Sequence, residues 1–506
     1  MSSPIVIKRF LAYSEKSMQM PSFDDLKVVL DARYSEFDLI LLQTAYEYAK
    51  LAHEGQTRST GEPYFNHVFQ TAVKLAKLRL PSEVIAAGLL HDVPEDTERT
   101  LEDVEKEFGA DIAGMVASCT KLGKVKYRGE ERYIENLRKM FVAMAEDVRV
   151  IFIKFADRMH NMETLYARPE HKRLRIAKEV MEIYAPIANR LGMAEYRGQF
   201  EDHAFKYLFP RDYTWTQHLL EERVRKFGPA MNRAIPTVEK ELKDHNVNYV
   251  DIHGRMKHCY SLYKKLKKYG NDIDKVYDIV ALRIIVPSVA DCYAALGILH
   301  SLYTPLPGRI KDYIAQPKPN GYSSLHTTVF DDQGAIVEFQ IRTQQMHEED
   351  EYGIAAHWRY KEGSAKNKHV TWMEEFAKIQ KEISGDTFMD HLDNMKLDMF
   401  RDRIFVFTPR GDVIDLPEDS TPVDFAYAVH TDIGNKTTMA QVNRVVAPLD
   451  TPLKSGDVVE IVTDKNRKLP NEDWLRFVKT HQAREKIKDA LRATKRSFIS
   501  KMLGRS

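Results

Sequence analysis

Cysteine is scarce in this chain of 506 residues, and the three that occur, Cys119, Cys259 and Cys292, lie far apart. They form no CxxC pair, which argues against a thiolate metal site and favours a reducing compartment. Long apolar runs are absent too, because no stretch approaches the roughly 18 residues that cross a membrane. The start, MSSPIVIKRFLAYSEK, has no signal-peptide core. We therefore expect a cytoplasmic protein without a membrane partner.

An excess of charge of one sign is also missing. Lys and Arg number 75 and Asp and Glu 74, which gives a formal net charge of +1. Bulk electrostatics therefore indicates neither a nucleic acid nor a membrane as the partner, and any partner must be recognised by a local patch. The length is too great for one ordinary core and predicts about three or four domains.

Apolar residues at helical spacing dominate the first half of the chain. An irregular start is followed by a helix at Phe37–Ala52, and helices continue to about residue 245. The later helices are expected at Arg99–Phe108, Ala110–Leu122, Arg132–Met144, Arg149–Tyr166 and Lys172–Arg190. The first domain is therefore predicted to be all-helical.

The pattern changes beyond residue 245. Val276–Pro287 and Ala335–Arg342 are apolar and rich in β-branched residues, as strands are, and a helix is expected between them at Val289–Tyr303. This mixture predicts an α/β domain. The polar segment Glu362–His369 is typical of a linker. Short runs between Arg403 and Asp464 alternate with Gly and Pro turns, which predicts a small β-rich module before a basic helical end.

Four ionisable side chains crowd the end of an apolar helix in the segment Val84–Thr97, VIAAGLLHDVPEDT. Charged groups are rarely buried unless they are paired or bind a metal, so this segment predicts a cleft or a metal site. His91 and Glu95 are four positions apart. Asp92 and Asp96 have the same separation, so each pair would share a helix face if the turn continues. The proline inside the motif leaves that open, because it biases the residue before it away from helical geometry.

A candidate metal site combines residues from separate predicted helices. His67, the His91-Asp92 pair and Asp157 provide imidazole and carboxylate ligands. Such ligands suit a borderline or hard divalent ion such as Mn²⁺ and leave positions open for water. An isolated His-Asp dipeptide is weak evidence, because a structural histidine is the commoner case in a chain with 18 histidines. The combination of several motifs carries more weight.

Acidic residues also occur in the segments predicted as strands. Asp278 and Glu338 lie on those strands, where a carboxylate is costly unless it meets a cation. Magnesium binds through one or two carboxylates and keeps substrate phosphates and water as its other ligands, so the pair predicts a Mg²⁺ nucleotide site. Basic residues surround them in the sequence: Arg255, Lys257, Lys264, Lys265, Lys267, Lys268, Arg309, Lys311 and Lys318. A solvated basic helix is the alternative for Lys264, Lys267 and Lys268.

The motifs GEPYFNH, HDVPEDT and FADRMHN, in this order, resemble those of HD-type metal phosphohydrolases. With AHEGQTR and ENLRKMFVAMAEDVRVI they are more similar to the hydrolase domain of the long RelA/SpoT homologues, which cleave guanosine tetraphosphate and pentaphosphate. The resemblance implies that Mn²⁺ is held by His67, His91, Asp92 and Asp157. It also implies that Glu95 and Asp96 activate the water that attacks the 3′-pyrophosphate, and that the nucleotide is contacted by Arg58, Asn161 and Thr164. Glu163 stands where the family commonly has arginine and is expected on the solvated surface.

The stretch PGRIKDYIAQPKPNGYSSLHTTVF resembles the synthetase domain of the same family. The resemblance implies pyrophosphate transfer from ATP to the 3′-hydroxyl of GDP or GTP, with Asp278 holding Mg²⁺ and Glu338 assisting the metal or taking the hydroxyl proton. Tyr322 would stack on guanine. The other positions that match nucleotide contacts of the family are Arg255, Lys257, Ser261, Lys265, Arg309, Lys311, Lys318, Asn320 and His326.

A third resemblance covers Arg403–Asp464, with TPVDFAYAVHTDIGNK at its centre, and is to the β-grasp TGS domain of this family. It implies that this module senses tRNA, the ribosome or a regulatory protein, with His430 near the tRNA acceptor end. The fold class we expect is therefore multidomain. Its parts are an all-α HD-type hydrolase domain at 1–195, a helical connector at 196–245, an α/β nucleotidyltransferase-like synthetase domain at 246–362, linker helices at 363–402, the TGS domain at 403–464 and the start of a helical regulatory region at 465–506.

Together these features predict a bifunctional alarmone enzyme that acts on guanosine nucleotides and ATP, with Mn²⁺ for hydrolysis and Mg²⁺ for synthesis. Opposing activities would consume ATP without net product. We therefore hypothesise that nucleotide bound in one domain disfavours the other domain through residues 190–250. Two alternatives stay open: a hydrolase-dominant enzyme with a weak synthetase, and a non-enzymatic regulator that binds the ribosome or tRNA with vestigial pockets.

Overall fold

The computed structural model describes residues 20–502 except 31, 124–146, 318–321, 332, 359–402, 455, 465 and 468. The chain forms two compact units, Met1–Ile379 and Gln380–Ser506. The helix expected at Arg132–Met144, the linker at Glu362–His369 and the linker helices at 363–402 lie outside the described residues. Within the described ones, no helix is long and apolar enough to span a membrane.

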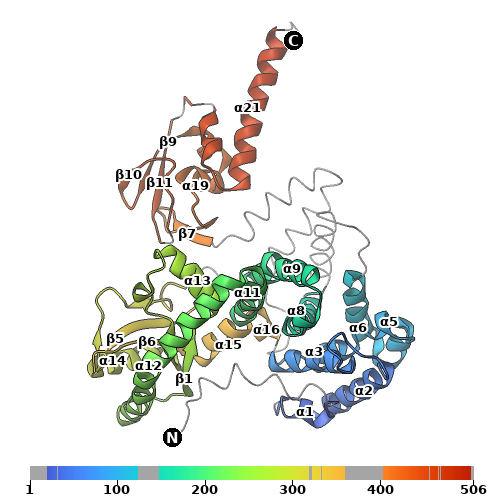
Figure 1. Ribbon diagram of the computed structural model, residues 1–506. Coiled ribbons are helices and arrows are strands. Elements are labelled where there is room, and N and C mark those ends of the chain that lie inside the picture. The colour runs from blue at the N-terminus through green and yellow to red at the C-terminus, as the bar shows by residue number, and fades with distance from the viewer. Residues whose placement is uncertain are drawn as a thin grey trace. The chain divides into compact units, whose positions relative to one another are not determined.

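Helices form the first part of the first unit (Figure 1). They are α1 (Phe23–Lys27), α2 (Glu36–Ala52), α3 (Phe65–Lys77), α4 (Ser82–Leu90), α5 (Val93–Asp96), α6 (Leu101–Gly123), α8 (Arg149–Glu163), α9 (Glu170–Glu179), α10 (Ala185–Arg190), α11 (Ala194–Leu208) and α12 (Pro210–Asp244). The prediction of an irregular start is wrong at α1, where Ser22 and Asp25 form a capping box that stabilises the first turn. The helices expected at Arg99–Phe108 and Ala110–Leu122 merge into α6, with Gly109 in a left-handed conformation at the kink.

The apolar helix α4 packs against α2, α3, α6 and α8. Its residues from Val84 to Leu90 are all buried, so the hydrophobic effect fixes this helix in the core. The close approach of α3 requires Gly88, since a Cβ there would lie 2.3 Å from Leu75 Cδ1. The end of α4 consequently carries His91 into the interior, where it is buried.

A mixed sheet with the strand order β1-β2-β6-β5-β3 forms the second part of the first unit, and β4 pairs with β5. The strands are β1 (Asp251–Met256), β2 (Val280–Val286), β3 (Thr304–Pro305), β4 (Lys311–Asp312), β5 (Leu325–Phe330) and β6 (Ile336–Thr343). The helices are α13 (Cys259–Lys268), α14 (Val289–Leu302), α15 (Gln344–Tyr352) and α16 (Ile354–Trp358). The two strands expected from the sequence are β2 and β6, which pair in parallel, and the helix expected between them is α14.

The two faces of this sheet differ in polarity, because side chains alternate along each strand. Apolar side chains such as Leu282, Ile284 and Phe339 pack with α12 and α14 in one core. The alternate positions include Arg283 on β2 and Glu338 on β6, and α15 packs against these two strands. We call the face that carries Arg283 and Glu338 the polar face, and it is the part of the sheet suited to a charged ligand.

The second unit contains a sheet β10-β9-β11 and a hairpin β7-β8. Its elements are β7 (Arg403–Phe407), β8 (Val413–Pro417), α19 (Pro422–Val429), α20 (Thr431–Lys436), β9 (Thr437–Val442), β10 (Val445–Ala447), β11 (Val459–Thr463) and α21 (His481–Met502). The buried carboxylate of Asp424 on α19 accepts hydrogen bonds from the backbone N–H groups of Lys479 (2.9 Å) and Thr480 (2.8 Å). Trp474 packs on Tyr427, which also lies on α19. The segment after β11, expected to begin a separate region, is therefore packed on the β-rich module itself.

A half-buried ion cluster joins α11 to the start of α13. His258 Nδ1 lies 2.9 Å from Asp202 Oδ2, and His258 Nε2 lies 3.4 Å from Glu195 Oε2. Burial alone would lower the pKa of His258, but the two carboxylates outweigh burial and raise that pKa to about 10. Gly198 makes room for the imidazole, because a Cβ there would lie 2.2 Å from the ring. Since α11 also packs on α8, this cluster connects the helical part to the sheet.

Replacing His258 by alanine is expected to destabilise the first unit by about 3 kcal/mol at neutral pH, because two carboxylates lose their shared cation. In the wild type, the stabilisation that His258 provides is fully present below the pKa of about 6.5 that this histidine has in the unfolded chain. It is lost as the pH rises through the folded pKa of about 10. Urea unfolding of the full chain across this pH range measures both effects. His245→Ala, at the exposed end of α12, is the matched control, and equal stability of the two variants would contradict the prediction.

Candidate functional sites

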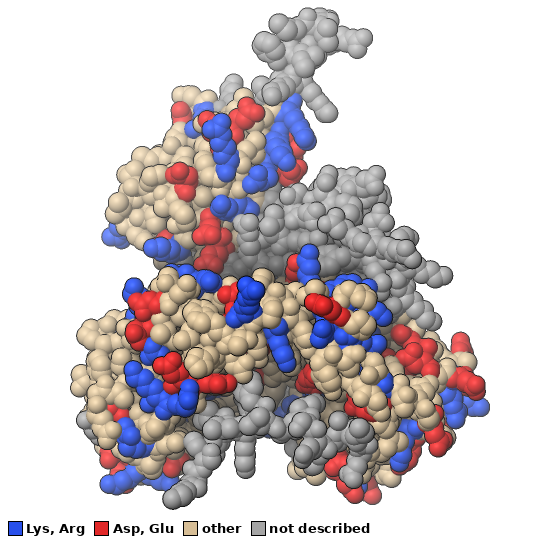
Figure 2. Space-filling view, viewed as in Figure 1, with Lys and Arg blue, Asp and Glu red and all other residues tan. Residues whose placement is uncertain are grey.

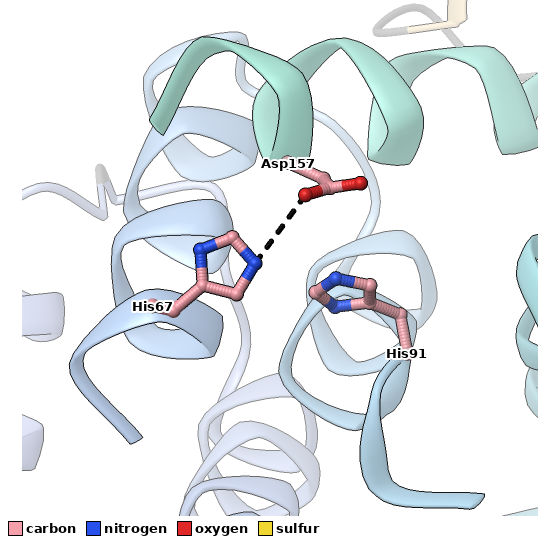
Figure 3. Close-up of side chains that lie close together, drawn as sticks. All are labelled: His67, His91 and Asp157. Carbon is pink, nitrogen blue, oxygen red and sulfur yellow. Dashed lines mark ion pairs between the residues drawn. The ribbon is translucent and has the colours of Figure 1, made fainter. Parts of the chain in front are cut away.

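Helices of the first unit bring imidazole and carboxylate groups together. His67 lies in the first turn of α3, His91 follows α4, and Asp157 lies within α8. One potential ligand atom of each residue lies within 4.8 Å of the others. Figure 3 shows the two imidazoles and the carboxylate facing a common space. We call His67, His91, Asp92 and Asp157 the HD cluster.

Asp92 bridges the two imidazoles of the HD cluster. Its Oδ2 lies 3.5 Å from His67 Nε2, and its Oδ1 lies 3.2 Å from His91 Nε2. His67 Nε2 is also 3.3 Å from Asp157 Oδ1. Burial alone would raise the pKa of both carboxyls, but the imidazoles and the nearby Lys154 hold the pKa of each below its ordinary value. Both carboxylates are therefore ionised at neutral pH.

The outer nitrogens of the two imidazoles already have partners. His67 Nδ1 lies 2.8 Å from His160 Nδ1, and His91 Nδ1 donates to the Gly88 carbonyl oxygen at 2.8 Å. A neutral imidazole that donates through Nδ1 keeps Nε2 as an acceptor. His91 Nε2 is buried and makes no hydrogen bond, although the Asp92 carboxylate is close. A buried lone pair beside carboxylates fits a cation, so the donor set suits a divalent metal.

Tyr64, which the sequence analysis missed, ties Asp96 to the HD cluster. Its hydroxyl oxygen lies 2.9 Å from Asp92 Oδ2 and 2.6 Å from Asp96 Oδ2. Burial and these two carboxylates raise the pKa of Tyr64, so it remains a neutral donor. A signal was available, because Tyr64 precedes His67 by about one helical turn in GEPYFNH.

The helix does not run straight through the HDVPED motif. α4 ends before His91, and α5 begins after Asp92. Asp96 N donates to the Asp92 carbonyl oxygen at 2.9 Å, so these two residues lie one turn apart while His91 stays outside that turn. Pro94 lies in the first turn of α5, where its missing N–H leaves no helical hydrogen bond unmade. Glu95 is half-buried, and burial raises the pKa of its carboxyl, which makes it a better proton acceptor than an exposed glutamate.

A cavity of about 300 Å³ lies next to the HD cluster, and we call it the basic pocket. It is lined by Arg58, Ser59, Arg158, Asn161, Thr164, Leu165, Arg168, Lys172, Arg175 and Ile176. Arg58 donates to Asn161 Oδ1 (2.6 Å) and to Thr164 Oγ1 (3.1 Å), so the three expected nucleotide contacts of this domain lie together. The Asn161 amide also donates to Asp157, which links the pocket to the HD cluster.

Most of the cations of the basic pocket were missed from the sequence. Lys172 and Arg175 come from α9, and Figure 2 shows blue Lys and Arg side chains gathered where Figure 1 places that helix. The run HKRLR is equally typical of a solvated helix face, so its pattern alone did not indicate a pocket. The prediction that Glu163 lies on the solvated surface is wrong, because its side chain is only 16% exposed. Both of its carboxylate oxygens lie 2.8 Å from Lys74 Nζ on the neighbouring helix α3.

Asp278 precedes β2 instead of lying on it, which corrects the prediction. Its Oδ2 is 2.9 Å from Lys257 Nζ, and its Oδ1 is 2.8 Å from Lys265 Nζ. Burial alone would raise the pKa of Asp278, but these two ammonium groups hold it well below its ordinary value. The turn before the strand therefore gathers one carboxylate and two lysines, all of them expected site residues.

Glu338 lies on β6, as predicted, and is 7% exposed. Its Oε1 accepts from Gln340 Nε2 at 3.2 Å and lies 3.3 Å from His326 Nδ1. Arg255 on β1 donates to Gln340 Oε1 at 3.2 Å. The other side of His326 contacts the hydroxyl of Tyr322, at 2.7 Å from Nε2. The polar face thus brings Arg255, Tyr322, His326 and Glu338 together in one group of contacting polar side chains.

The remaining expected contacts of this domain are only partly described. The Arg309 guanidinium lies over the Tyr277 ring, 4.7 Å from its centroid, next to Asp278. Ser261 lies on α13, and Lys311 on β4 pairs with His326. Lys318 and Asn320 lie outside the described residues. In the second unit, exposed His430 caps α20 by accepting from Asp432 N at 3.2 Å, and its expected tRNA role stays a prediction.

The buried arginines of the polar face were also missed. Arg283 donates to Glu351 at 2.6 Å, and Arg342 donates to Asp350 and to the Tyr322 hydroxyl. A signal was present, because both arginines lie inside the apolar strand segments, where a charge is as costly as that of Glu338.

A helical region with clustered His and Asp ligand atoms, an α/β sheet with a charged face and a β-rich module define a multidomain protein with two candidate sites for charged ligands. Three family models match the chain in this order: "HD domain" at residues 45–194, "Region found in RelA / SpoT proteins" at 254–365 and "TGS domain" at 404–463. The predicted fold class is confirmed, since the described helices and sheets follow the same order.

Similar proteins of known name cover nearly the whole chain. It is 47% identical over 459 residues to a guanosine-3′,5′-bis(diphosphate) 3′-pyrophosphohydrolase of Aquifex aeolicus, covering 90% of this chain and 65% of that protein. It is 42% identical over 480 residues to the bifunctional (p)ppGpp synthase/hydrolase SpoT of Escherichia coli, covering 94% and 68%. It is 42% identical over 502 residues to a GTP pyrophosphokinase of Myxococcus xanthus, covering 97% and 66%. The chain belongs to the RelA/SpoT family, and it spans about two thirds of the length of these relatives.

Proposed function

We propose that this chain is a bifunctional alarmone enzyme. It hydrolyses the 3′-pyrophosphate of guanosine tetraphosphate and pentaphosphate, and it transfers pyrophosphate from ATP to the 3′-hydroxyl of GDP or GTP. The observation that carries the proposal is that one chain contains two separate acidic constellations, the HD cluster among the helices and Asp278 with Glu338 at the sheet. The names of the Aquifex, Escherichia and Myxococcus relatives, which include both activities, support it.

For hydrolysis, the HD cluster would hold a divalent cation, and Mn²⁺ is the ion we propose because imidazole and carboxylate ligands suit it. Such a cation supplies Lewis acidity to the phosphoryl group. The proton of the attacking water passes to Glu95, whose half-buried carboxyl has a raised pKa. Tyr64 holds Asp96 beside the cluster, at 2.6 Å, so the second acidic residue of the motif is also oriented toward the reaction.

The basic pocket would bind the rest of the alarmone. Asn161 contacts both Asp157 of the HD cluster and Arg58 of the pocket. A nucleotide whose 3′-pyrophosphate lies at the cluster therefore extends past Arg58 and Asn161. Lys172 and Arg175 on α9 then meet the 5′-phosphates, for which guanidinium and ammonium groups are suitable donors.

For synthesis, Asp278 would hold Mg²⁺, which in nucleotide sites takes one or two carboxylates and receives its other ligands from phosphates and water. Bound there, the ion neutralises charge on the transferred phosphates. Lys257 and Lys265, which pair with Asp278, would turn to the triphosphate of ATP. Glu338 accepts the proton of the 3′-hydroxyl. Tyr322 stacks on guanine through the ring face opposite to Arg342, whose guanidinium lies 4.9 Å from the ring centroid.

One observation favours the alternative of a hydrolase-dominant enzyme. Both oxygens of Asp278 are occupied by lysine ammonium groups, at 2.9 and 2.8 Å. A cation can bind this carboxylate only after at least one lysine moves away. In the HD cluster, by contrast, the ammonium group of Lys154 lies farther from its carboxylate, at 3.7 Å from Asp157 Oδ2, and His91 Nε2 faces Asp92 without a hydrogen bond. The hydrolase site is therefore the better prepared of the two for its ion.

The proposal is tested with the purified full chain and labelled nucleotides. With guanosine tetraphosphate and Mn²⁺ we expect release of pyrophosphate and formation of GDP. With ATP, GDP and Mg²⁺ we expect guanosine tetraphosphate, which anion-exchange chromatography separates from its precursors. Hydrolysis with little synthesis would support the hydrolase-dominant alternative. Absence of both products would leave the non-enzymatic regulator, which would act through the TGS module on tRNA, the ribosome or a regulatory protein.

A further inference from the structure

A continuous row of polar side chains in contact with one another crosses the polar face and ends at Glu338. Asp350 on α15 pairs with the guanidinium of Arg342, and Arg342 Nη2 donates to the Tyr322 hydroxyl at 2.6 Å. The Tyr322 hydroxyl lies 2.7 Å from His326 Nε2, and His326 Nδ1 lies 3.3 Å from Glu338 Oε1. The row draws on α15, on β5, on the segment before β5 and on two positions of β6, so only the folded sheet assembles it.

The two ends of the row are buried, and Tyr322 and His326 between them are half-buried and held by ring contacts. Arg342 is 0% exposed, and Asp350 and Glu338 are each 7% exposed. The Arg342 guanidinium also lies over the Tyr322 ring, and the Tyr313 ring meets the His326 imidazole edge to face at 5.3 Å. A buried arginine is costly unless all its neighbours accept its charge. Asp350 and the Tyr322 hydroxyl both accept from Arg342 and so hold it beneath the ring.

The direction of each hydrogen bond follows from the arginine. A guanidinium only donates, so the Tyr322 oxygen accepts from Arg342 and its own hydrogen is directed to His326 Nε2. The imidazole then carries its hydrogen on Nδ1, which faces Glu338 Oε1. Gln340 donates to the same Oε1. Among the described side chains none donates to Oε2, so Oε1 accepts from Gln340 and lies 3.3 Å from the His326 Nδ1–H, while Oε2 is left to accept a proton.

We propose that His326 is a positioning residue for Glu338, and that Tyr322 and Arg342 set its tautomer. This inference rests on the proposed synthetase function, in which Glu338 takes the proton of the 3′-hydroxyl. It gives His326 a role different from the nucleotide contact expected from the sequence. The imidazole holds Oε1 of Glu338, and Oε2 is thereby aimed at the acceptor hydroxyl. The same side chains act before any nucleotide arrives, because all of these contacts exist within the protein.

Two amide variants of one histidine test the proposal. An asparagine amide can replace the Nδ1–H donor of His326, whereas a glutamine amide reaches the Nε2 position instead. We expect His326→Asn to keep kcat of synthesis within about threefold, and His326→Gln to lower kcat on the order of 10- to 100-fold, with KM for GDP unchanged. Tyr322→Phe keeps the ring for stacking and removes only the hydroxyl, so it should lower kcat without raising KM.

Hydrolysis by the same preparations reports whether each variant is folded. His300→Asn is the matched control, because His300 contacts Thr327, the neighbour of His326, from the other face of the sheet. If both His326 variants raise KM for GDP and leave kcat unchanged, His326 is a nucleotide contact and the proposal is wrong. If Glu338→Gln retains the full synthesis rate, the role of Glu338 in the proposed function fails instead, whatever the His326 variants show.

Discussion

Hydrolysis of guanosine tetraphosphate is expected to fall on the order of 1,000-fold when Asp92 is replaced by alanine, because a ligand of the catalytic cation supplies several kcal/mol. Asp92 is the residue that joins the cluster, with its oxygens 3.5 Å from His67 Nε2 and 3.2 Å from His91 Nε2. The Tyr64 hydroxyl lies 2.9 Å from Asp92 and 2.6 Å from Asp96, so the two carboxylates share its single hydrogen. The loss of Asp92 therefore removes a metal ligand and one of the two carboxylates that position the tyrosine. Pyrophosphate release with Mn²⁺ measures the effect.

Synthesis in the same Asp92→Ala preparation should stay within about twofold of the wild type, since substitutions at distant sites act independently. Asp244→Ala, at the exposed end of α12, is the matched control and should change neither activity. Mn²⁺ titration gives a second readout, because the variant should bind the ion more weakly without any substrate present. Full hydrolysis with unchanged Mn²⁺ affinity would show that the cluster is a structural ion pair.

The central residues of the HD cluster could be predicted from sequence because their motifs are specific. His67, His91, Asp92 and Asp157 do lie together. His160 could not be predicted, since its contact with His67 depends on how α3 packs against α8. The cations of the basic pocket were missed for a related reason. A helix rich in lysine and arginine has the same sequence pattern whether its charged face meets water or a cavity.

In the sheet, the two main strands and the burial of Glu338 followed from composition and alternation. Arg283 and Arg342 could have been found by the same argument, because each occupies an apolar strand. The position of Asp278 before β2 could not be predicted, because strand boundaries depend on the pairing partner. Here β1 pairs with β2 only from Val280 onward. The coupling hypothesis stays open, although the His258 cluster shows where α11 contacts the synthetase part.

Synthesis is expected to fall on the order of 1,000-fold in Asp278→Asn, while hydrolysis stays within about twofold of the wild type. Asparagine keeps the shape of the side chain and removes its charge. The variant therefore loses the proposed Mg²⁺ ligand and also the counter-charge of Lys257 and Lys265, which lie 2.9 and 2.8 Å from the carboxylate. Burial lowers the pKa of Lys257 and the Asp278 carboxylate opposes that effect, so the pKa of Lys257 should fall further in the variant.

Asp274→Asn is the matched control for this variant. Asp274 is an exposed aspartate of the same loop that pairs with Arg223, and surface pairs contribute little, so its loss should leave both activities unchanged. Formation of guanosine tetraphosphate from ATP and GDP with Mg²⁺ is the measurement, and hydrolysis by the same preparation reports folding. A folding defect in the first unit would reduce both activities together, because the His258 cluster joins the two parts. Undiminished synthesis would mean that Asp278 only anchors the two lysines and that the cation is held elsewhere.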